Sequence, residues 1–227
     1  MKKVFFVTVI ALMLLLSAQV VQAAAWSSCD KWATWTNSGY TVYNNVWGSG
    51  AGSQCIYANN GANWWVTCNH GSSGGIKSYP NNTKTLNKTT NNTPWCGTWF
   101  QVTPGSGAYC TAFDVWGNGQ QYEIMMWMNK SGAVGPIGSQ QYSNQSIGGH
   151  TWNVYKGMNG SINVFSFVRT SNTNSANVDH KAIWNWVQSK GWWNNPTIGK
   201  IQFGFEITNT GGASRTFTCN GRSDWNG

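Results

Sequence analysis

The two glutamates of this chain are its candidate catalytic residues, because each interrupts an otherwise apolar segment. Glu123 lies within residues 122–129, and Glu206 lies within residues 201–208. The length of the first segment and the glycines around it favour a strand over a helix, and the second segment repeats the arrangement. An unpaired carboxylate is costly to bury, so each glutamate needs a cleft or a partner. We therefore expect Glu123 and Glu206 to form a carboxylate pair.

Strand alternation places both glutamates on the less apolar face of their strands. The opposite faces are fully apolar and predict a buried core. Asp114, in residues 112–116, follows the same parity and shares its face with Trp116. The side chains expected to share a face with the two glutamates are Met125 and Trp127 in the first strand and Gln202, Gly204 and Thr208 in the second.

Asp114 is the third candidate, because a nearby carboxyl can share a proton with a nucleophilic carboxylate and tune its charge. The other acidic residues are weaker candidates. Asp30 lies near the start of the expected mature chain, Asp179 on an expected helix and Asp224 near the end of the sequence.

A pair of carboxyl groups suits the hydrolysis of a glycosidic bond. One group protonates the leaving oxygen, and the other attacks or activates water; retaining enzymes hold the two about 5 Å apart. The composition agrees with a neutral sugar ligand, since charged residues make up 9% of the chain and tryptophans number 16. Indoles stack on sugar rings, and amide side chains bond to hydroxyls. Two alternatives remain at this point: a non-catalytic carbohydrate-binding module or lectin, and purely structural carboxylates.

The pattern along the chain predicts an all-β fold. Short β-type runs alternate with Gly- and Asn-rich turns, which is typical of a sandwich or barrel. The runs are residues 40–47, 54–58, 63–69, 75–79, 95–102, 108–116, 122–129, 150–156, 161–168, 201–208 and 214–219. One helix is expected at residues 178–190, capped by Ser175 or Asn177 and packed on the back of a sheet. Residues 80–94, rich in Asn and Thr, are expected to form a polar surface loop.

The N-terminal residues predict export. Residues 1–25 have the charged start, apolar segment and small-residue end of a secretory signal peptide, and residues 26–227 suffice for one domain. Six cysteines then indicate up to three disulfides of open pairing. No later segment is expected to cross a membrane. The net charge of +8 comes from scattered residues, which disfavours nucleic-acid binding, and the three separated histidines and absent C-x-x-C motifs disfavour a metal site.

Several segments together resemble glycoside hydrolase family 12, the small endo-β-1,4-glucanases and xyloglucan-specific endoglucanases. They run in the family's order over nearly the whole expected mature chain: residues 29–34, 43–48, 77–79, 113–116, 122–127, 135–139, 164–168 and 202–206.

The resemblance implies a concanavalin-like jelly roll of two antiparallel sheets, with a substrate groove on the concave sheet and a single helix on the convex side. It implies a retaining mechanism with Glu123 as nucleophile, Glu206 as general acid/base and Asp114 hydrogen-bonded to the nucleophile. It also implies a Cys29–Cys55 disulfide and no metal or organic cofactor. The expected enzyme is a secreted monomer acting on cellulose, mixed-linkage β-glucan or xyloglucan.

The resemblance also implies a set of groove residues. Trp47 would be a stacking platform, and Met125 and Trp127 would support the groove near the point of cleavage. The full set of expected substrate-binding residues is Asn45, Trp47, Trp116, Met125, Trp127, Pro136, Ile137 and Gln202.

Overall fold

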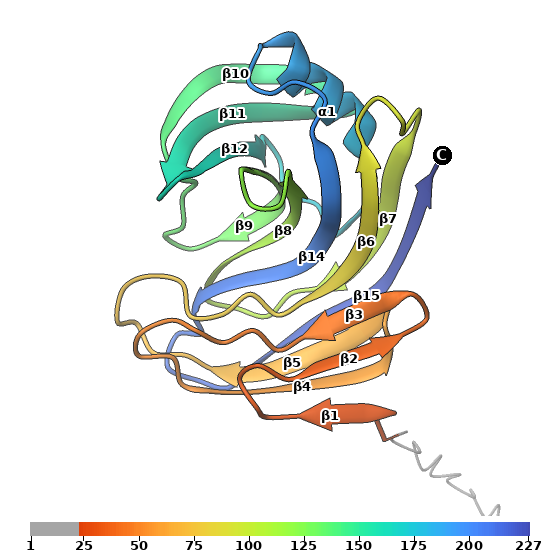
Figure 1. The fold of residues 1–227 in the computed structure, drawn as a ribbon. Helices are drawn as coiled ribbons and strands as arrows, with labels where there is room; N and C mark the ends of the chain where they lie inside the picture. Colours follow the sequence, from red (N-terminus) through yellow and green to blue (C-terminus); the bar gives the residue numbers. More distant parts are fainter. Residues whose placement is uncertain (1–22) are drawn as a thin grey trace, which may run out of the picture.

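The computed structural model describes residues 23–227, so the expected signal peptide lies almost wholly outside the described residues. These residues form two packed β-sheets and one helix (Figure 1). The all-β jelly roll predicted from the sequence is therefore confirmed. Every strand pairing among them is antiparallel except that between β12 (Ile162–Arg169) and β9 (Tyr122–Ser131). The described helix is too short to cross a membrane.

The two sheets differ in size, and only the larger one bears the glutamates. In spatial order the smaller sheet contains β1 (Trp26–Ser28), β4 (Ser53–Asn60), β5 (Asn63–Asn69), β15 (Arg215–Asn226), β7 (Cys96–Thr103) and β13 (Ser175–Asp179). The larger, strongly curved sheet contains β10 (Ser139–Ile147), β11 (His150–Asn159), β12 (Ile162–Arg169), β9 (Tyr122–Ser131), β8 (Ala108–Gly117), β14 (Thr197–Asn209), β6 (Asn81–Thr89), β3 (Tyr40–Tyr43) and β2 (Thr34–Asn37) (Figure 1).

Aromatic side chains fill the space between the sheets. Phe113 on β8 and Phe203 on β14 have ring centroids 4.4 Å apart, and Phe100 on β7 lies 4.9 Å from Phe203. All three are fully buried. Such tilted and edge-to-face pairs add to the stabilisation from apolar burial. The core therefore fixes β8 and β14, the two strands that carry Asp114 and Glu206.

The single helix, α1 (His180–Ser189), closes one end of this core beside β7 and β10 (Figure 1). Its buried apolar residues, Ile183, Trp184 and Val187, belong to the core between the sheets. The expected caps, Ser175 and Asn177, lie instead on strand β13. Asp179 is the cap, because its carboxylate accepts a hydrogen bond from the Ala182 amide at 2.8 Å.

Residues 81–89 correct the prediction of a polar surface loop at 80–94. They form strand β6, in which Asn81, Asn82 and Thr83 are buried. The Asn82 amide donates to the Gly61 carbonyl at 2.8 Å, so its polar side chain has a partner inside the protein. A polar sequence can thus form an internal strand when its amides are satisfied.

The cysteines follow the prediction only in part. Cys29 and Cys55 form the expected disulfide between the N-terminal segment and β4. The further disulfides expected among the remaining cysteines do not form, since Cys68, Cys96, Cys110 and Cys219 are free and buried. They occupy the interior as small apolar side chains, and burial raises the pKa of each thiol.

A buried ion pair joins β15 to the larger sheet. Arg222 bonds to Asp224 at 2.9 Å and to the backbone carbonyls of Asn82 and Ile201. Burial alone raises the pKa of Asp224, but the charge of Arg222 and hydrogen bonds from Arg222, Thr98 and Tyr40 outweigh burial and lower it. Arg222 thus satisfies a carboxylate that is costly to bury.

We expect Arg222→Met to lower the free energy of unfolding by about 3–5 kcal/mol, because it leaves the Asp224 charge buried without its partner. Urea unfolding at neutral pH measures the effect. The pKa of Asp224 is lowered in the folded state, so its contribution is present above the unfolded pKa of about 3.9 and is lost as pH falls through the folded pKa. The difference between wild type and variant should therefore shrink in acid.

Lys88→Met is the matched control, since Lys88 is an exposed cation bonded only to the Gly227 carbonyl. It should change the free energy of unfolding by no more than about 0.5 kcal/mol. Equal effects of the two substitutions would contradict a stabilising role for the buried pair.

Candidate active site

Three carboxyl groups lie on three adjacent strands of the larger sheet. Strand β8 runs between β9 and β14, so Asp114 lies between the strands of Glu123 and Glu206. The register pairs Asp114 with Met125 on β9 and with Gln202 on β14. Neighbouring residues such as Phe113 point to the core, which confirms the strand parity predicted from the sequence.

Asp114 and Glu123 form a coupled pair. They are 5% and 7% exposed, and their carboxyl groups are hydrogen-bonded to each other. Burial, followed by the negative charge of Glu123, holds the pKa of Asp114 well above its usual range. Burial also raises the pKa of Glu123, but the hydrogen bond from Asp114 opposes that rise. The favoured state is a protonated Asp114 that donates to an ionised Glu123.

The surroundings of Glu206 favour its protonated form, and no hydrogen bond from a neighbouring carboxyl of the described residues opposes that effect. Burial and then the negative charge of Glu123 raise the pKa of Glu206 to about 7. Glu206 therefore keeps its proton in weakly acidic solution, whereas the hydrogen bond from Asp114 favours the ionised form of Glu123. Two carboxyl groups whose surroundings separate their pKa values are suited to the roles of acid and nucleophile.

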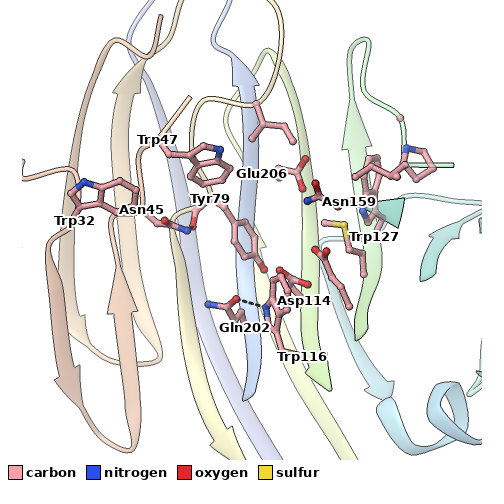
Figure 2. A pocket seen from close by; sticks show the side chains of 16 residues that line it. Trp32, Asn45, Trp47, Tyr79, Asp114, Trp116, Trp127, Asn159, Gln202 and Glu206 are labelled. Carbon is pink, nitrogen blue, oxygen red and sulfur yellow. Dashed lines mark hydrogen bonds between the residues drawn. The ribbon is translucent and has the colours of Figure 1, made fainter. Parts of the chain in front are cut away.

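These carboxyl groups lie in a groove of about 400 Å³ on the concave face of the sheet (Figure 2). Every site residue predicted from the sequence lines this groove. The prediction missed five further lining residues: Trp32, Ile76, Tyr79, Gly135 and Asn159. Trp32, Tyr79 and Gly135 lie in segments that resembled the family, whereas nothing in the sequence distinguished Ile76 or Asn159.

One side of the groove carries two exposed indoles, Trp32 and Trp47, which are 64% and 48% exposed. The backbone around Trp47 is tightly held: its amide donates to the Lys77 carbonyl at 3.1 Å. A Cβ on Gly48 would lie 2.0 Å from the Ile76 carbonyl oxygen, so only glycine fits at that position. Trp47 and Trp32 therefore stand as platforms over a fixed backbone.

The floor near Asp114 is a hydrogen-bonded network of neutral side chains. Trp116 donates its indole N–H to Gln202 at 2.7 Å (Figure 2). The Gln202 amide in turn donates to Asn81 and Thr83 at 3.2 and 3.1 Å. Gln202 thus orients Trp116, and its hydrogen-bonding capacity is largely used within the protein.

Tyr79 supports the floor from the neighbouring segment. Its hydroxyl donates to the Ala112 carbonyl at 3.1 Å, and its backbone amide donates to the Asn45 carbonyl at 3.0 Å. Asn45 adopts a left-handed conformation with φ of 47° and donates its amide to the Tyr79 carbonyl at 3.2 Å. These reciprocal bonds fix both residues at the groove.

The opposite rim is the loop that contains Pro136 and Ile137. A Cβ on Gly138 would lie 2.0 Å from the Lys156 carbonyl oxygen, so this loop packs directly on β11. Below the loop, the Trp127 indole nitrogen is buried and has no hydrogen-bond partner among the described residues. It is a free donor beside the carboxyl groups. Within residues 23–227, no group of three or more His, Cys, Asp or Glu side chains is arranged to hold a metal ion.

A curved jelly-roll sheet whose tryptophan-lined groove holds paired carboxyl groups, one of them with a raised pKa, has the features of a glycoside hydrolase. The family model of Glycosyl hydrolase family 12 matches residues 38–223. The chain belongs to glycoside hydrolase family 12.

Relatives and solved structures agree with this assignment. Xyloglucan-specific endo-beta-1,4-glucanase A of Emericella nidulans is 34% identical over 198 residues, covering 78% of this chain and 82% of that protein. The xyloglucanase domain of NopAA from Sinorhizobium fredii, solved in complex with cellobiose, is 33% identical with a TM-score of 0.86, covering 90% of this chain and 100% of that domain. Endoglucanase 3 of Trichoderma harzianum is 28% identical with a TM-score of 0.80, covering 91% and 100% of the respective chains.

We expect Glu123→Gln to lower the pKa of Glu206 below about 7, because it removes the negative charge that raises that pKa. The chain contains only these two glutamates. Selective ¹³C labelling of glutamate carboxyls therefore gives a single signal in the variant, and its pH titration by NMR measures the pKa directly.

Asp179→Asn is the control, because its carboxylate is exposed and caps α1. It should leave the Glu206 titration unchanged. A pKa for Glu206 that stays near 7 in Glu123→Gln would show that the two glutamates are not electrostatically coupled.

Proposed function

We propose that this protein is a retaining endo-β-1,4-glucanase in which Glu123 is the nucleophile and Glu206 the general acid/base. The observation that carries the proposal is the separation of protonation states in the groove. Glu206 has a pKa of about 7, whereas Glu123 receives a hydrogen bond from Asp114 that favours its ionised form. A retaining glycosidase needs that combination before substrate arrives.

The reaction is a double displacement. Ionised Glu123 attacks the anomeric carbon while Glu206 protonates the departing glycosidic oxygen, which leaves a covalent glycosyl-enzyme. Glu206, now ionised, takes a proton from water as the water attacks the same carbon and releases Glu123. Two inversions leave the product in the β configuration. Asp114 acts through Glu123, because it stabilises the charge that Glu123 carries before attack and after release.

The groove supports a polysaccharide substrate and cleavage within its chain. Trp32 and Trp47 stand on one side of the carboxyl groups, next to β2 and β3 (Figure 2). The Pro136–Ile137 loop packs on β11, towards the opposite edge of the larger sheet, so sugar units can bind on both sides of the cleaved bond. The exposed indoles offer stacking surfaces for sugar rings. Xyloglucan is the first substrate to test, since the named relatives include xyloglucan-specific enzymes.

The alternative of a non-catalytic binding module is not favoured, because stacking and hydrogen bonding to a neutral sugar need no carboxyl with a raised pKa. Burying Asp114, Glu123 and Glu206 together costs stability that a binding module has no reason to lose. Fold alone would not decide the question; the argument lies in the site.

We further propose that the enzyme acts outside the cell as a monomer. Residues 1–25 have the features of a signal peptide, and the Cys29–Cys55 disulfide suits an oxidising compartment. The groove is lined by residues of one chain and needs no second copy to complete it.

Substitution of each glutamate should abolish hydrolysis of polymer, and azide should then separate their roles. With an aryl β-cellobioside, azide can attack in place of the missing Glu123 carboxylate, so Glu123→Ala should give the α-glycosyl azide. Glu206→Ala still forms the glycosyl-enzyme with this activated leaving group, so azide should give the β-glycosyl azide. Product NMR measures both outcomes.

The wild type and the two variants are also assayed for release of reducing ends from xyloglucan, barley β-glucan and carboxymethyl cellulose. The polymer that the wild type cleaves is the substrate. Circular dichroism confirms that the variants are folded. The reversed azide stereochemistry would exchange the two roles, and binding without any release of reducing ends would favour the binding module.

Asp114→Ala should move the acidic limb of the kcat/KM profile to higher pH. The substitution removes the hydrogen bond that lowers the pKa of Glu123, so ionised Glu123 is lost at a higher pH than in wild type. At pH values below the pKa of Glu123, each unit by which that pKa increases lowers kcat/KM about tenfold.

Asp114→Asn is the matched variant, since its amide can still donate to Glu123. Its acidic limb should lie closer to that of wild type. The same displacement of the limb in both variants would contradict the hydrogen-bond explanation and leave only a packing role for Asp114.

A further inference from the structure

Three tryptophans lie together on the outer face of the smaller sheet, away from the groove. Trp95 directly precedes β7, Trp99 lies within β7, and Trp225 lies on the neighbouring strand β15. Trp95 and Trp225 are 57% and 41% exposed, and Trp99 is half-buried. The alternate residues of β7, such as Phe100, point into the core. We call Trp95, Trp99 and Trp225 the indole row.

The strand register staggers the three indoles. Trp225 pairs with Gly97, Trp99 pairs with Ser223, and Gly227 donates its backbone amide to the Trp95 carbonyl at 3.1 Å. Successive outward positions on a strand are about 7 Å apart, so indoles alternate between β7 and β15 at roughly that interval along the strands.

Glycines on the facing strands allow these indoles to lie against the backbone. A Cβ on Gly97 would lie 2.5 Å from the Trp225 ring, one on Gly227 would lie 2.7 Å from the Trp95 ring, and one on Gly221 would lie 2.9 Å from the Trp99 ring. Each ring therefore covers a glycine of the neighbouring strand. This packing gives the rings a defined place on the sheet and leaves much of Trp95 and Trp225 facing solvent.

The groups that flank Trp99 are neutral hydrogen-bonding groups, and the two charged neighbours of the indole row are held by bonds within the protein. Trp99 lies between Asn177 on β13 and Ser223 on β15, and Gln101 follows on the same face. The carboxylate of Asp179 at this face is occupied as the cap of α1. At the other end, Lys88 bonds to the Gly227 carbonyl at 3.0 Å. Exposed indoles beside amides and hydroxyls match the chemistry of the groove itself.

We infer that the indole row is a second binding surface for a neutral β-linked glucan chain. It lies on the opposite face of the sandwich from the groove, so a polymer bound there leaves the groove open. Sugar rings stack on the staggered indoles, and Asn177 and Ser223 bond to their hydroxyls. The choice of polymer rests on the proposed function. The surface holds the enzyme on a long substrate between cleavages and should add nothing to the hydrolysis of short oligosaccharides.

Affinity electrophoresis in gels containing tamarind xyloglucan or barley β-glucan tests this inference. The catalytically blocked Glu123→Gln protein is compared with two derivatives, one carrying Trp95→Ala and Trp225→Ala, the other carrying Ser223→Glu. The second keeps all three indoles and places a charge opposite Trp99, so it does not depend on the stability of the double alanine variant. We expect both derivatives to bind the polymer roughly three- to tenfold more weakly than Glu123→Gln alone.

Two controls separate this surface from the groove. Trp65→Ala removes a tryptophan of the same outer face that stacks on Tyr57 outside the indole row, and it should leave retardation unchanged. Trp47→Ala weakens groove binding, and its effect should add to that of the indole row because the two surfaces are separate.

Equal retardation of Glu123→Gln and both derivatives would overturn the inference, as would the absence of retardation by either polymer. A dimer in sedimentation that Ser223→Glu dissociates would also overturn it, by assigning the surface to a second copy of the chain. Absence of hydrolysis by the wild-type protein would refute the proposed function instead, since retardation is measured without catalysis.

Discussion

Mutual repulsion among three neighbouring carboxyl groups is the constraint on which the site depends. Asp114, Glu123 and Glu206 lie on three adjacent strands; Asp114 and Glu123 are buried and Glu206 is half-buried, so ionising any of them is costly. The three cannot all be ionised in weakly acidic solution. The least costly arrangement places the charge on Glu123, where Asp114 donates a hydrogen bond, and keeps protons on Asp114 and Glu206. That arrangement is also the one a retaining mechanism requires.

The scaffold makes this arrangement possible because the sheet sets the spacing of the carboxyl groups. Strand alternation directs Phe113, Phe203 and their neighbours into the core while Asp114 and Gln202 face the groove. The aromatic contacts across β7, β8 and β14 hold those strands in register. A slip of one residue in β14 would turn Glu206 into the core and Phe205 into the groove. The packing of the core therefore also fixes the positions of the carboxyl groups.

The sequence predicted which side chains of β8, β9 and β14 face the core and which face the groove. In each strand, apolar core residues alternate with residues of a less apolar face that carries one acid. The strands that the sequence did not reveal are β1, β2, β10 and β13, which form the edges of the two sheets. Edge strands bury few side chains, so their sequences lack the apolar alternation on which prediction depends. Strand β6 was mistaken for a loop because its buried amides are satisfied by distant partners such as Gly61 and Arg222.

The groove residues that could be predicted lie in the segments that resemble the family. All of the predicted site residues line the groove. Ile76 reaches it from the segment between β5 and β6, and Asn159 reaches it from the end of β11. The prediction of further disulfides failed because four cysteines are used as buried apolar side chains on separate parts of the core. Cysteine count bounds the number of disulfides, and only the fold decides whether the partners meet.

The most direct test of the account is to trap the covalent intermediate. An activated 2-deoxy-2-fluoro-β-cellobioside slows both steps, but its leaving group lets the first step proceed, so the glycosyl-enzyme accumulates for mass spectrometry. The account predicts one sugar adduct per chain, carried by the peptide that contains Glu123. No adduct, or an adduct on the peptide of Glu206 or Asp114, would contradict the assignment of Glu123 as the nucleophile.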